Sequence, residues 1–252
     1  MKVYNKPLYY EIAFDFVDIK RQVKLFEAFI KQYSKTPVKR IMDIGSGTSK
    51  QVRELAKQGY QTVALDLSAE MLEFLNREAK KEGVEVETVK ANFIDFKLAK
   101  KVDFACMLMG TITYMSSNED FLKHLNSVAG SLNRGGLYLL ENLKLDWSSK
   151  KFFKPQSWTM KRGKIKVKTT YTIKLKDTLE QLFDEELKLE INDNGHKTVI
   201  ASSFTSKMIF PQELLELVKE NGQFEFLGWF ERYTTKPLKR ASGDNILLLR
   251  KR

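Results

Sequence analysis

Hydrophobic residues follow two different spacings along the first 142 positions of the chain. Short runs of largely consecutive apolar residues predict strands at residues 38–44, 60–67, 84–91, 102–110 and 137–142. Between them, apolar residues recur every three or four positions and predict helices at residues 49–59, 69–83 and 118–132. Strands that alternate with helices, and that are apolar on both faces, indicate a parallel sheet covered by helices.

A different pattern begins after Asn142. Residues 164–176 alternate apolar residues with lysines, and residues 179–191 alternate apolar residues with acids. Strict alternation is typical of half-buried antiparallel strands, and Asn194-Gly195 is a favoured two-residue hairpin turn. The residues expected to face inward are Ile165, Val167, Thr169, Tyr171, Ile173, Leu175, Phe183, Leu187, Leu189 and Ile191.

A predicted helix at residues 211–222 and strands at 224–230 and 245–250 complete the chain. We therefore expect residues 1–149 and 210–252 to form an α/β core with a seven-stranded, mostly parallel sheet and helices on both faces. Residues 150–209 should form an antiparallel β insertion between strands 5 and 6 of that sheet. The insertion is expected to act as a substrate lid or as a dimerisation surface.

Charge adds one open question about partners. The 252 residues include 43 Lys and Arg against 32 Asp and Glu, a formal net charge of +11. Such an excess attracts nucleic acid or acidic ligands, or simply keeps a protein soluble. The lysine face of residues 164–176 should lie beside the acidic face of residues 179–191, giving cross-strand ion pairs. This pairing favours a solvated surface over a groove for a polyanion.

Few residues are suited to disulfide or metal chemistry. Cys106 is the single cysteine, lies in an apolar run and is expected to be buried and inert. The two histidines have no metal-ligand spacing with cysteine or acids, and we expect His124 on the surface of its helix. The sequence lacks an apolar stretch that spans a bilayer and lacks the features of a signal peptide, so a cytoplasmic protein is expected.

The most informative local motif is the glycine turn after the first predicted strand. Gly45 and Gly47 have no Cβ and let backbone and ligand approach closely. Lys50 stands where a dinucleotide fingerprint has its third small residue, and no G-K-[ST] ending is present for a nucleoside triphosphate. Asp66 ends the second strand, where an acid accepts hydrogen bonds from both ribose hydroxyls. The pattern predicts a nucleoside ligand without phosphates.

Each of these residues alone has a simpler interpretation. The two glycines are compatible with a plain turn, and Asp66 with a neighbour of a helix cap at Ser68. Their joint order along the chain favours ligand binding.

Five successive segments resemble the ordered motifs of the class I S-adenosylmethionine-dependent methyltransferases. They are MDIGSGTS, LDLSAEML, VKANFIDF, VDFACMLMGTITYM and LNRGGLYLLEN, and the match covers residues 38–142 in order. The final helix and two strands agree with the same fold. The resemblance implies a Rossmann-like fold and S-adenosylmethionine as the cofactor.

The resemblance also implies which residues meet the cofactor. Those expected against its methionine part are Asp43, Gly45, Ser46 and Gly47. Asp66 is expected to bind its ribose. The remaining expected contacts are Tyr10 in the N-terminal segment, Leu67 and Met71 near the adenine, Asn92 and Phe93 at the adenine edge, and Leu108 and Met109 in the fourth strand. Ser49 replaces the commonest glycine of the turn, and we expect this position to need smallness rather than a positive φ angle.

Two features bear on the methyl acceptor: the antiparallel insertion and the aromatic N-terminal segment. Together they resemble the corresponding parts of small-molecule methyltransferases, especially those that methylate amino groups of sugars. Methyl transfer is an in-line displacement from a sulfonium, so the protein mainly aligns the reacting atoms and excludes water. A base is useful only when the acceptor arrives protonated, and the catalytic candidates are Glu141 and Tyr114. Glu141 is also compatible with a structural carboxylate, and Tyr114 with a packed phenol.

These features predict an enzyme that transfers a methyl group from S-adenosylmethionine to a nitrogen or oxygen atom of a small molecule. Two alternatives stay open. The basic insertion is compatible with an RNA or protein acceptor, and the fold is compatible with a protein that binds the cofactor without catalysis. A monomer or homodimer is expected, with no membrane partner and no metal.

Overall fold

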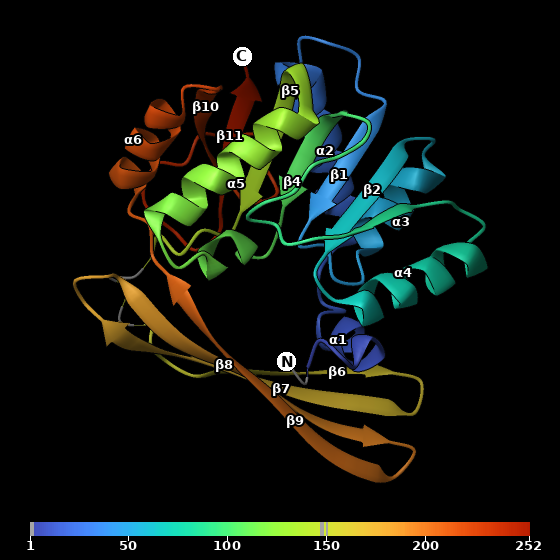
Figure 1. Ribbon diagram of the computed structural model, residues 1–252. Helices are drawn as coiled ribbons and strands as arrows, with labels where there is room; N and C mark the ends of the chain where they lie inside the picture. The colour runs from blue at the N-terminus through green and yellow to red at the C-terminus, as the bar shows by residue number, and fades with distance from the viewer. Residues whose placement is uncertain (1–2, 147–148, 150) are drawn as a thin grey trace.

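The computed structural model describes residues 3–146, 149 and 151–252, and its strands form two separate sheets (Figure 1). The larger sheet has the order β10-β11-β5-β4-β1-β2-β3, and β11 runs antiparallel to both of its neighbours. Its strands are β1 (Arg40–Ile44), β2 (Gln61–Asp66), β3 (Glu87–Lys90), β4 (Val102–Met107), β5 (Leu132–Glu141), β10 (Phe224–Glu231) and β11 (Asn245–Lys251). The predicted seven-stranded, mostly parallel sheet is confirmed.

Helices pack on both faces of this sheet because successive residues of a strand point to opposite faces. In β1, Ile41 belongs to a hydrophobic cluster with Phe26 of α2, whereas Met42 belongs to a cluster with Phe121 of α5. The helices of this core are α2 (Ile19–Tyr33), α3 (Lys50–Lys57), α4 (Ala69–Lys81), α5 (Asn118–Ser131) and α6 (Pro211–Asn221). Both clusters use the sheet as their common wall.

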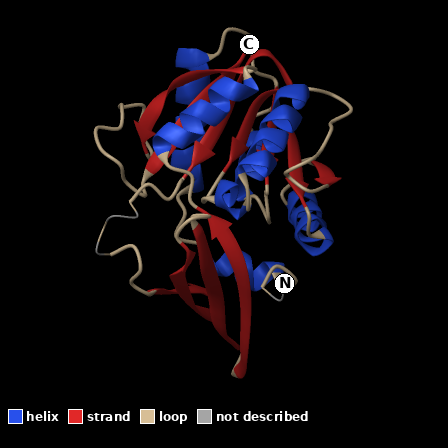
Figure 2. Cartoon of the chain, turned by 60° about the vertical axis from the view of Figure 1, so that its left-hand side comes forward, coloured by secondary structure: helices blue, strands red, loops and turns tan. Residues whose placement is uncertain are grey.

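The smaller sheet is an antiparallel insertion between β5 and β10. Its strands are β6 (Gln156–Arg162), β7 (Ile165–Asp177), β8 (Leu182–Asp193) and β9 (His196–Lys207). Asn194 and Gly195 join β8 to β9 with φ angles of 51° and 92°, as the predicted two-residue turn requires. Figure 2 shows this sheet standing apart from the layered α/β part of the molecule.

One face of the insertion is charged and the other is mainly apolar, as predicted. On the outer face, Lys168 and Glu190 lie 3.3 Å apart, and Lys176 and Asp184 lie 3.2 Å apart, which confirms the expected cross-strand pairing. On the inner face, one inward prediction is wrong: Leu175 is 51% exposed, because the β7–β8 register shifts just after it. Lysines paired in this way leave less free charge for a polyanion than the composition suggests.

The short helix α1 (Pro7–Ala13) packs on the insertion rather than on the main sheet. Ile12 and Ala13 share a hydrophobic cluster with Val167 of β7 and Leu189 of β8. The Trp158 indole of β6 donates a hydrogen bond of 2.7 Å to the carbonyl of Ala13. The first helix is therefore part of the same layer as the insertion.

Two local predictions differ from the structure. Residues 133–136, which separate the predicted helix at 118–132 from the predicted strand at 137–142, lie within β5, where the β4–β5 register jumps from the Val102–Leu132 pair to the Phe104–Leu137 pair. His124, expected at a helix surface, is fully buried. One ring nitrogen lies 2.6 Å from the Phe93 carbonyl and the other 2.6 Å from the Tyr138 hydroxyl. Burial lowers the pKa of His124 to about 4.

Cys106 is buried, as expected. Within the described ranges, no helix is both long and apolar enough to cross a membrane. The same residues contain no cluster of three or more His, Cys, Asp or Glu side chains able to hold a metal ion.

Candidate active site

A cavity of about 510 Å³ lies between the carboxyl edge of the main sheet and the insertion. One wall comes from the segments that follow β1, β2, β4 and β5, including the short helix η1 (Thr111–Tyr114). The other wall comes from α1 and its preceding residues together with side chains of β6, β7, β8 and β9. This is the edge of a parallel sheet where ligands are expected to bind.

The glycine turn forms the floor of the cavity with bare backbone. Gly45 and Gly47 have φ angles of 66° and 57°, which are unfavourable for residues with a Cβ. A Cβ on Gly45 would lie 2.6 Å from Cγ2 of Thr111, so only glycine fits there without movement of η1. A Cβ on Gly47 would lie 3.6 Å from the ring of Tyr10, which lines the same cavity.

Ser49 does more than stay small, so that expectation needs correction. Its φ angle is +24°, and its hydroxyl donates a hydrogen bond of 2.6 Å to Asp43. The same oxygen accepts from the Val52 N–H at 3.3 Å and caps α3. Burial raises the pKa of Asp43 to about 7, and the hydrogen bond from Ser49 opposes that rise. A serine hydroxyl therefore ties the end of β1 to the start of α3.

Asp66 is held at the cavity by two backbone hydrogen bonds. One carboxylate oxygen accepts from the Gly47 N–H at 2.7 Å, and the other accepts from the Ser68 N–H at 2.8 Å. Burial raises the pKa of Asp66, whereas these N–H groups lower it. Counting the hydrogen bonds among the described residues, each oxygen keeps a further lone pair, and the side chain lines the cavity. The carboxylate is thus able to accept one hydrogen bond at each oxygen from a ligand.

A second, smaller cavity of about 70 Å³ adjoins the first. The sequence-predicted residues that line it are Tyr10, Asp43, Gly45, Ser46, Leu108 and Met109. The hydroxyl oxygen of Ser46 is buried and has no hydrogen-bond partner among the residues described. A buried hydroxyl without a partner is unusual in a protein alone, and a polar ligand atom would satisfy it.

The remaining predicted cofactor contacts separate into two groups. Leu67 and Phe93 line the larger cavity, and Leu67 is 57% exposed. Met71 is fully buried and lines neither cavity. Asn92 is exposed, and its side-chain oxygen accepts from the Ile94 N–H at 2.9 Å, also outside both linings. The structure therefore brings Leu67 and Phe93, but not Met71 and Asn92, to the cavity wall.

Glu141 lies behind the wall rather than in it. Its carboxylate is buried, accepts from Arg232 at 3.1 Å and from Gln22 at 2.9 and 3.1 Å, and lines neither cavity. It also accepts from the backbone N–H of Met109 at 3.3 Å. This environment matches the alternative of a structural carboxylate that holds Met109 in place, and a catalytic role for Glu141 stays a prediction.

Tyr114 does line the larger cavity. Its hydroxyl lies 3.5 Å from that of Tyr4, and its ring centroid lies 4.6 Å from the ring centroid of Phe204. Burial raises the pKa of Tyr114 well above its ordinary value, so the phenol stays protonated near neutral pH. A role of Tyr114 as a base stays a prediction, and the raised pKa does not favour it.

Sequence reasoning missed a polar cluster that joins the insertion to the segments after β4 and β5. Lys144 contacts the carboxylate of Glu185, and its ammonium lies 3.2 Å from the hydroxyls of both Thr113 and Ser206. Tyr171 donates a hydrogen bond of 2.6 Å to the other oxygen of Glu185. Except for Ser206, these residues line the larger cavity. Strand phase was the available signal, because Glu185 is in step with the inward-facing apolar residues of β8.

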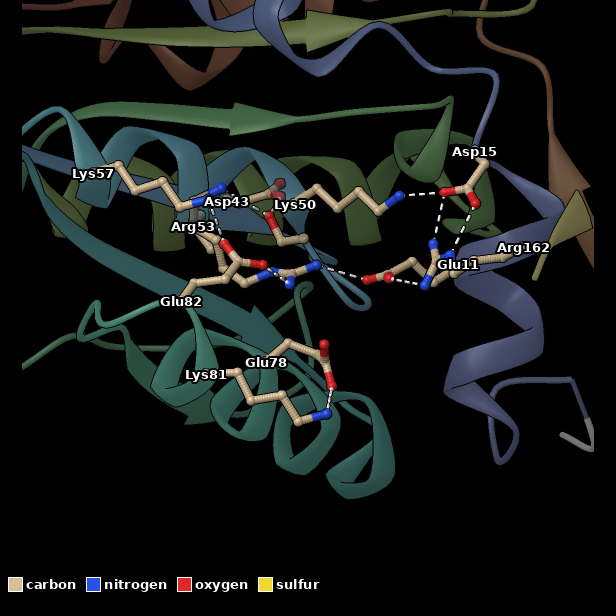
Figure 3. Close-up of polar contacts among 12 residues, drawn as sticks. Glu11, Asp15, Asp43, Lys50, Arg53, Lys57, Glu78, Lys81, Glu82 and Arg162 are labelled. Atoms are coloured by element: carbon tan, nitrogen blue, oxygen red, sulfur yellow. Dashed lines mark hydrogen bonds and ion pairs between the residues drawn. The ribbon is translucent and has the colours of Figure 1, made fainter.

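Ion pairs fix α1 between the insertion and the core (Figure 3). The buried carboxylate of Glu11 accepts from Arg53 of α3 at 2.7 Å and from Arg162 of β6 at 2.8 Å. Asp15, which follows α1, accepts from Arg162 at 2.7 Å and contacts the ammonium of Lys50. These contacts, which we call the latch, join the N-terminal segment, the insertion and the core beside the cavity.

The comparisons with known proteins agree with this geometry. Residues 41–136 match the sequence model of a family described as "Methyltransferase domain". A putative methyltransferase of Geobacillus sp. (strain WCH70) is 26% identical over 112 residues, which cover 44% of this chain and 45% of that protein. The matched segment therefore spans less than half the length of this curated relative.

Several solved structures resemble the chain over most of its length. An S-adenosylmethionine-dependent methyltransferase from Clostridium acetobutylicum ATCC 824 has a TM-score of 0.80 at 16% identity, with 97% of this chain and 96% of that chain covered. S-adenosylmethionine-bound CalS10, an amino pentose methyltransferase from Micromonospora echinaspora, has a TM-score of 0.72 at 14% identity, with 94% and 92% covered. The sugar N-methyltransferase KedS8 from Streptoalloteichus sp. ATCC 53650 has a TM-score of 0.72 at 15% identity, with 94% and 90% covered.

At these low identities, the structural likeness shows the fold, and the family match adds the domain. Within this fold, the chain has β11 reversed, a glycine turn after β1 and an acid at the end of β2. Residues 41–136 are therefore similar to a methyltransferase domain, and the chain as a whole has the fold of solved S-adenosylmethionine-dependent methyltransferases.

Proposed function

We propose that the protein is an S-adenosylmethionine-dependent methyltransferase that methylates a nitrogen or oxygen atom of a small molecule. The observation that carries this proposal is the cavity itself, which has a bare glycine floor and the Asp66 carboxylate on one side and an insertion wall on the other. The neighbours CalS10 and KedS8, which methylate an amino pentose and a sugar nitrogen by their descriptions, support a small acceptor.

The residues present fit S-adenosylmethionine. Gly45 and Gly47 form a cradle that a Cβ would fill, and the unpartnered Ser46 hydroxyl offers a hydrogen bond beside it. The two free lone pairs of Asp66 match the two hydroxyls of a ribose. When bound, the cofactor supplies a methyl group made electrophilic by a sulfonium.

The chain contributes alignment and the exclusion of water. Aromatic side chains of the N-terminal segment and the insertion line the space, with Tyr10 and Phe14 4.8 Å apart between ring centroids and Trp158 of β6 5.8 Å from Phe14. The latch holds these aromatic residues over the glycine turn. These mainly apolar surroundings are expected to hold acceptor and methyl group in line and to limit competing water.

Titration calorimetry with S-adenosylhomocysteine tests the cofactor half of the proposal. We expect a Kd of about 1–100 µM, comparable to the usual range of substrate affinities. ATP is the matched control, because it has the same nucleoside but carries phosphates for which the turn has no Walker lysine. Absence of S-adenosylhomocysteine binding at about 1 mM, or equal binding of ATP, would contradict the proposal.

A transfer assay tests the acceptor half. The protein is incubated with methyl-labelled S-adenosylmethionine and a bacterial extract, which is then separated by size. Label in the small-molecule fraction is the expected result. Label only in the RNA or protein fraction would instead support a macromolecular acceptor, and absence of label despite cofactor binding would support a protein that binds without catalysis.

A further inference from the structure

The polar cluster formed by Lys144 after β5 and by Tyr171, Glu185 and Ser206 of the insertion has no part in the cofactor site described above. The side chains of Lys144 and Glu185 are only 15% and 2% exposed. Buried charges are costly unless they are paired and fully hydrogen-bonded, and unpairing them is strongly destabilising. A buried ion pair that lines a cavity therefore either stabilises the fold or takes part in binding a ligand.

Within the cluster, the described residues use the donors of Lys144 fully and leave acceptor positions free. The three N–H groups of Lys144 are matched by Glu185, Thr113 and Ser206. One oxygen of Glu185 accepts from both Lys144 and Ser206, and the other accepts from Tyr171. A carboxylate oxygen accepts two hydrogen bonds, so the second oxygen of Glu185 has one lone pair free, counting the residues that the structure describes.

Tyr171 points to the same conclusion. Its O–H donates to Glu185, so its phenol oxygen is left as an acceptor. Thr113 already donates to the Gly110 carbonyl at 2.9 Å and accepts from Lys144. The cluster therefore offers acceptors to the cavity, and a group that binds it has to bring N–H or O–H donors.

The short helix η1 connects the polar cluster to the glycine turn, where the cofactor is proposed to bind. Within η1, Thr111 packs against the glycine turn at Gly45, and Thr113 contacts Lys144. Two residues of a 3₁₀-helix correspond to a rise of about 4 Å, so the two sides of the cavity are close enough for one reaction. Rings of Tyr114 and Phe204, 4.6 Å apart between centroids, flank this space with apolar surface.

We propose that Glu185 and Tyr171, with Lys144 and Ser206 behind them, form the subsite that binds the methyl acceptor through its N–H or O–H group. This proposal rests on the proposed methyltransferase function and adds residues of the insertion to it. Lys144 and Ser206 act as positioning residues, because they hold the Glu185 carboxylate while its free lone pair meets the ligand. Burial lowers the pKa of Lys144 to about 7, which fits its enclosed position beside Glu185.

Three small probes of nearly equal shape test the subsite: benzylamine, benzyl alcohol and toluene. Each is titrated by ligand-detected NMR into the full chain saturated with S-adenosylhomocysteine. Probes of about eight non-hydrogen atoms bind in the millimolar range at ordinary ligand efficiency. Wild-type protein should bind the amine and the alcohol about tenfold more tightly than toluene, because only they donate hydrogen bonds to the cluster.

Two variants remove the subsite in different ways. Glu185→Gln keeps the shape but removes the charge. Lys144→Met combined with Glu185→Leu replaces the buried pair by apolar residues, which avoids leaving one charge unpaired. Asp184→Asn is the matched control, because Asp184 is the exposed neighbour on the outer face of β8.

The expected result is that the preference for the amine and the alcohol over toluene falls to within about twofold in both variants and persists in Asp184→Asn. Persistence of the preference in the double variant, or no preference in the wild type, overturns the subsite. Failure of the wild type to bind S-adenosylhomocysteine overturns the proposed function instead, so the two failures are distinguishable.

Discussion

The two walls of the cavity are built by different kinds of interaction. On the main-sheet wall, backbone does the positioning: Gly45 and Gly47 present no side chains, and both oxygens of Asp66 accept backbone N–H groups. On the insertion wall, side chains position side chains, as when Glu185 of β8 contacts Lys144 from the segment after β5. The first wall is therefore expected to be intolerant of any added Cβ, and the second to be sensitive to charge.

The walls also differ in how far apart their partners lie in the sequence. Gly47 and Asp66 are 19 positions apart, whereas Lys144 and Glu185 are 41 apart and Glu11 and Arg162 are 151 apart. Short-range contacts form together with the strands and turns that carry them, but the latch needs the whole insertion in place. We infer that the main-sheet wall keeps its structure when distant parts of the chain change, whereas the structure of the insertion wall changes more easily.

Gly45→Ala should break the main-sheet wall and have the largest effect on binding. The new Cβ would lie 2.6 Å from Thr111, at a φ angle of +66° that disfavours alanine. The turn has to shift, and we expect S-adenosylhomocysteine to bind more than about a hundredfold more weakly by calorimetry.

Gly59→Ala is the control for this prediction. Gly59 also has a positive φ angle, +91°, but an added Cβ meets nothing within 4 Å. Both variants should lose about 1 kcal/mol of unfolding free energy from the backbone conformation, and only Gly45→Ala should lose affinity. Equal affinities of the two variants would mean that the turn is not the floor of the ligand site.

Arg162→Ala should weaken the insertion wall by opening the latch. The side chain is 37% exposed, so solvent screening limits its contribution to roughly 1 kcal/mol. We expect about fivefold weaker binding of S-adenosylhomocysteine and faster hydrogen exchange in α1, because Glu11 and Asp15 lose their partner on β6.

Lys161→Ala, at the exposed neighbouring position, should change neither quantity. Added salt should reduce the difference between Arg162→Ala and wild type, since the contact is electrostatic. Unchanged exchange in α1 after removal of Arg162 would show that the apolar packing of α1 holds it without the latch.

His124→Gln should have the smallest effect on binding and a clear effect on the pH dependence of stability. The ordinary pKa of 6.5 falls to about 4 in the folded protein. Between these values the unfolded chain binds the extra proton, so this stabilisation is present above pH 6.5 and is lost as pH falls towards 4. The loss in wild type relative to the variant should reach roughly 3 kcal/mol in urea unfolding.

Asp43 makes the comparison with the variant necessary. Its pKa rises from 3.8 to about 7, so the folded protein binds the extra proton in that range and stability falls as pH rises through it. This slope opposes that of His124 and is common to both proteins, so subtraction removes it. Parallel pH profiles of wild type and His124→Gln would contradict the neutral, buried state of His124.

The sequence predicts the two kinds of interaction in the site to different degrees. The alternation of strands and helices, the glycine turn at Gly45 and Gly47, the position of Asp66 at a strand end and the paired lysine face follow from local patterns, because turn chemistry and strand alternation act over a few residues. The placement of Glu141 depends on Arg232, which only the folded chain brings to within 3.1 Å. No local pattern records such a partner.

Glu185, Lys144 and the burial of His124 were not predicted from the sequence, and the physical reason differs for each. Glu185 occupies an inward position in an alternating strand, so strand phase alone marks it as a buried acid. Lys144 follows β5 at a position without periodicity, and its contacts come from β8, β9 and η1. His124 is buried because the Phe93 carbonyl and the Tyr138 hydroxyl meet its ring, which helical spacing cannot show.

The most direct test of the central claim compares S-adenosylhomocysteine binding of wild type with that of Asp66→Ala and Asp103→Ala. Asp103 likewise accepts two backbone N–H groups, at 2.9 and 3.0 Å, but lines neither cavity. Both variants should lose similar stability, whereas only Asp66→Ala should bind about thirtyfold more weakly, because it alone loses the proposed hydrogen bonds to ribose. Wild-type affinity in Asp66→Ala would contradict a nucleoside pocket at this edge of the sheet.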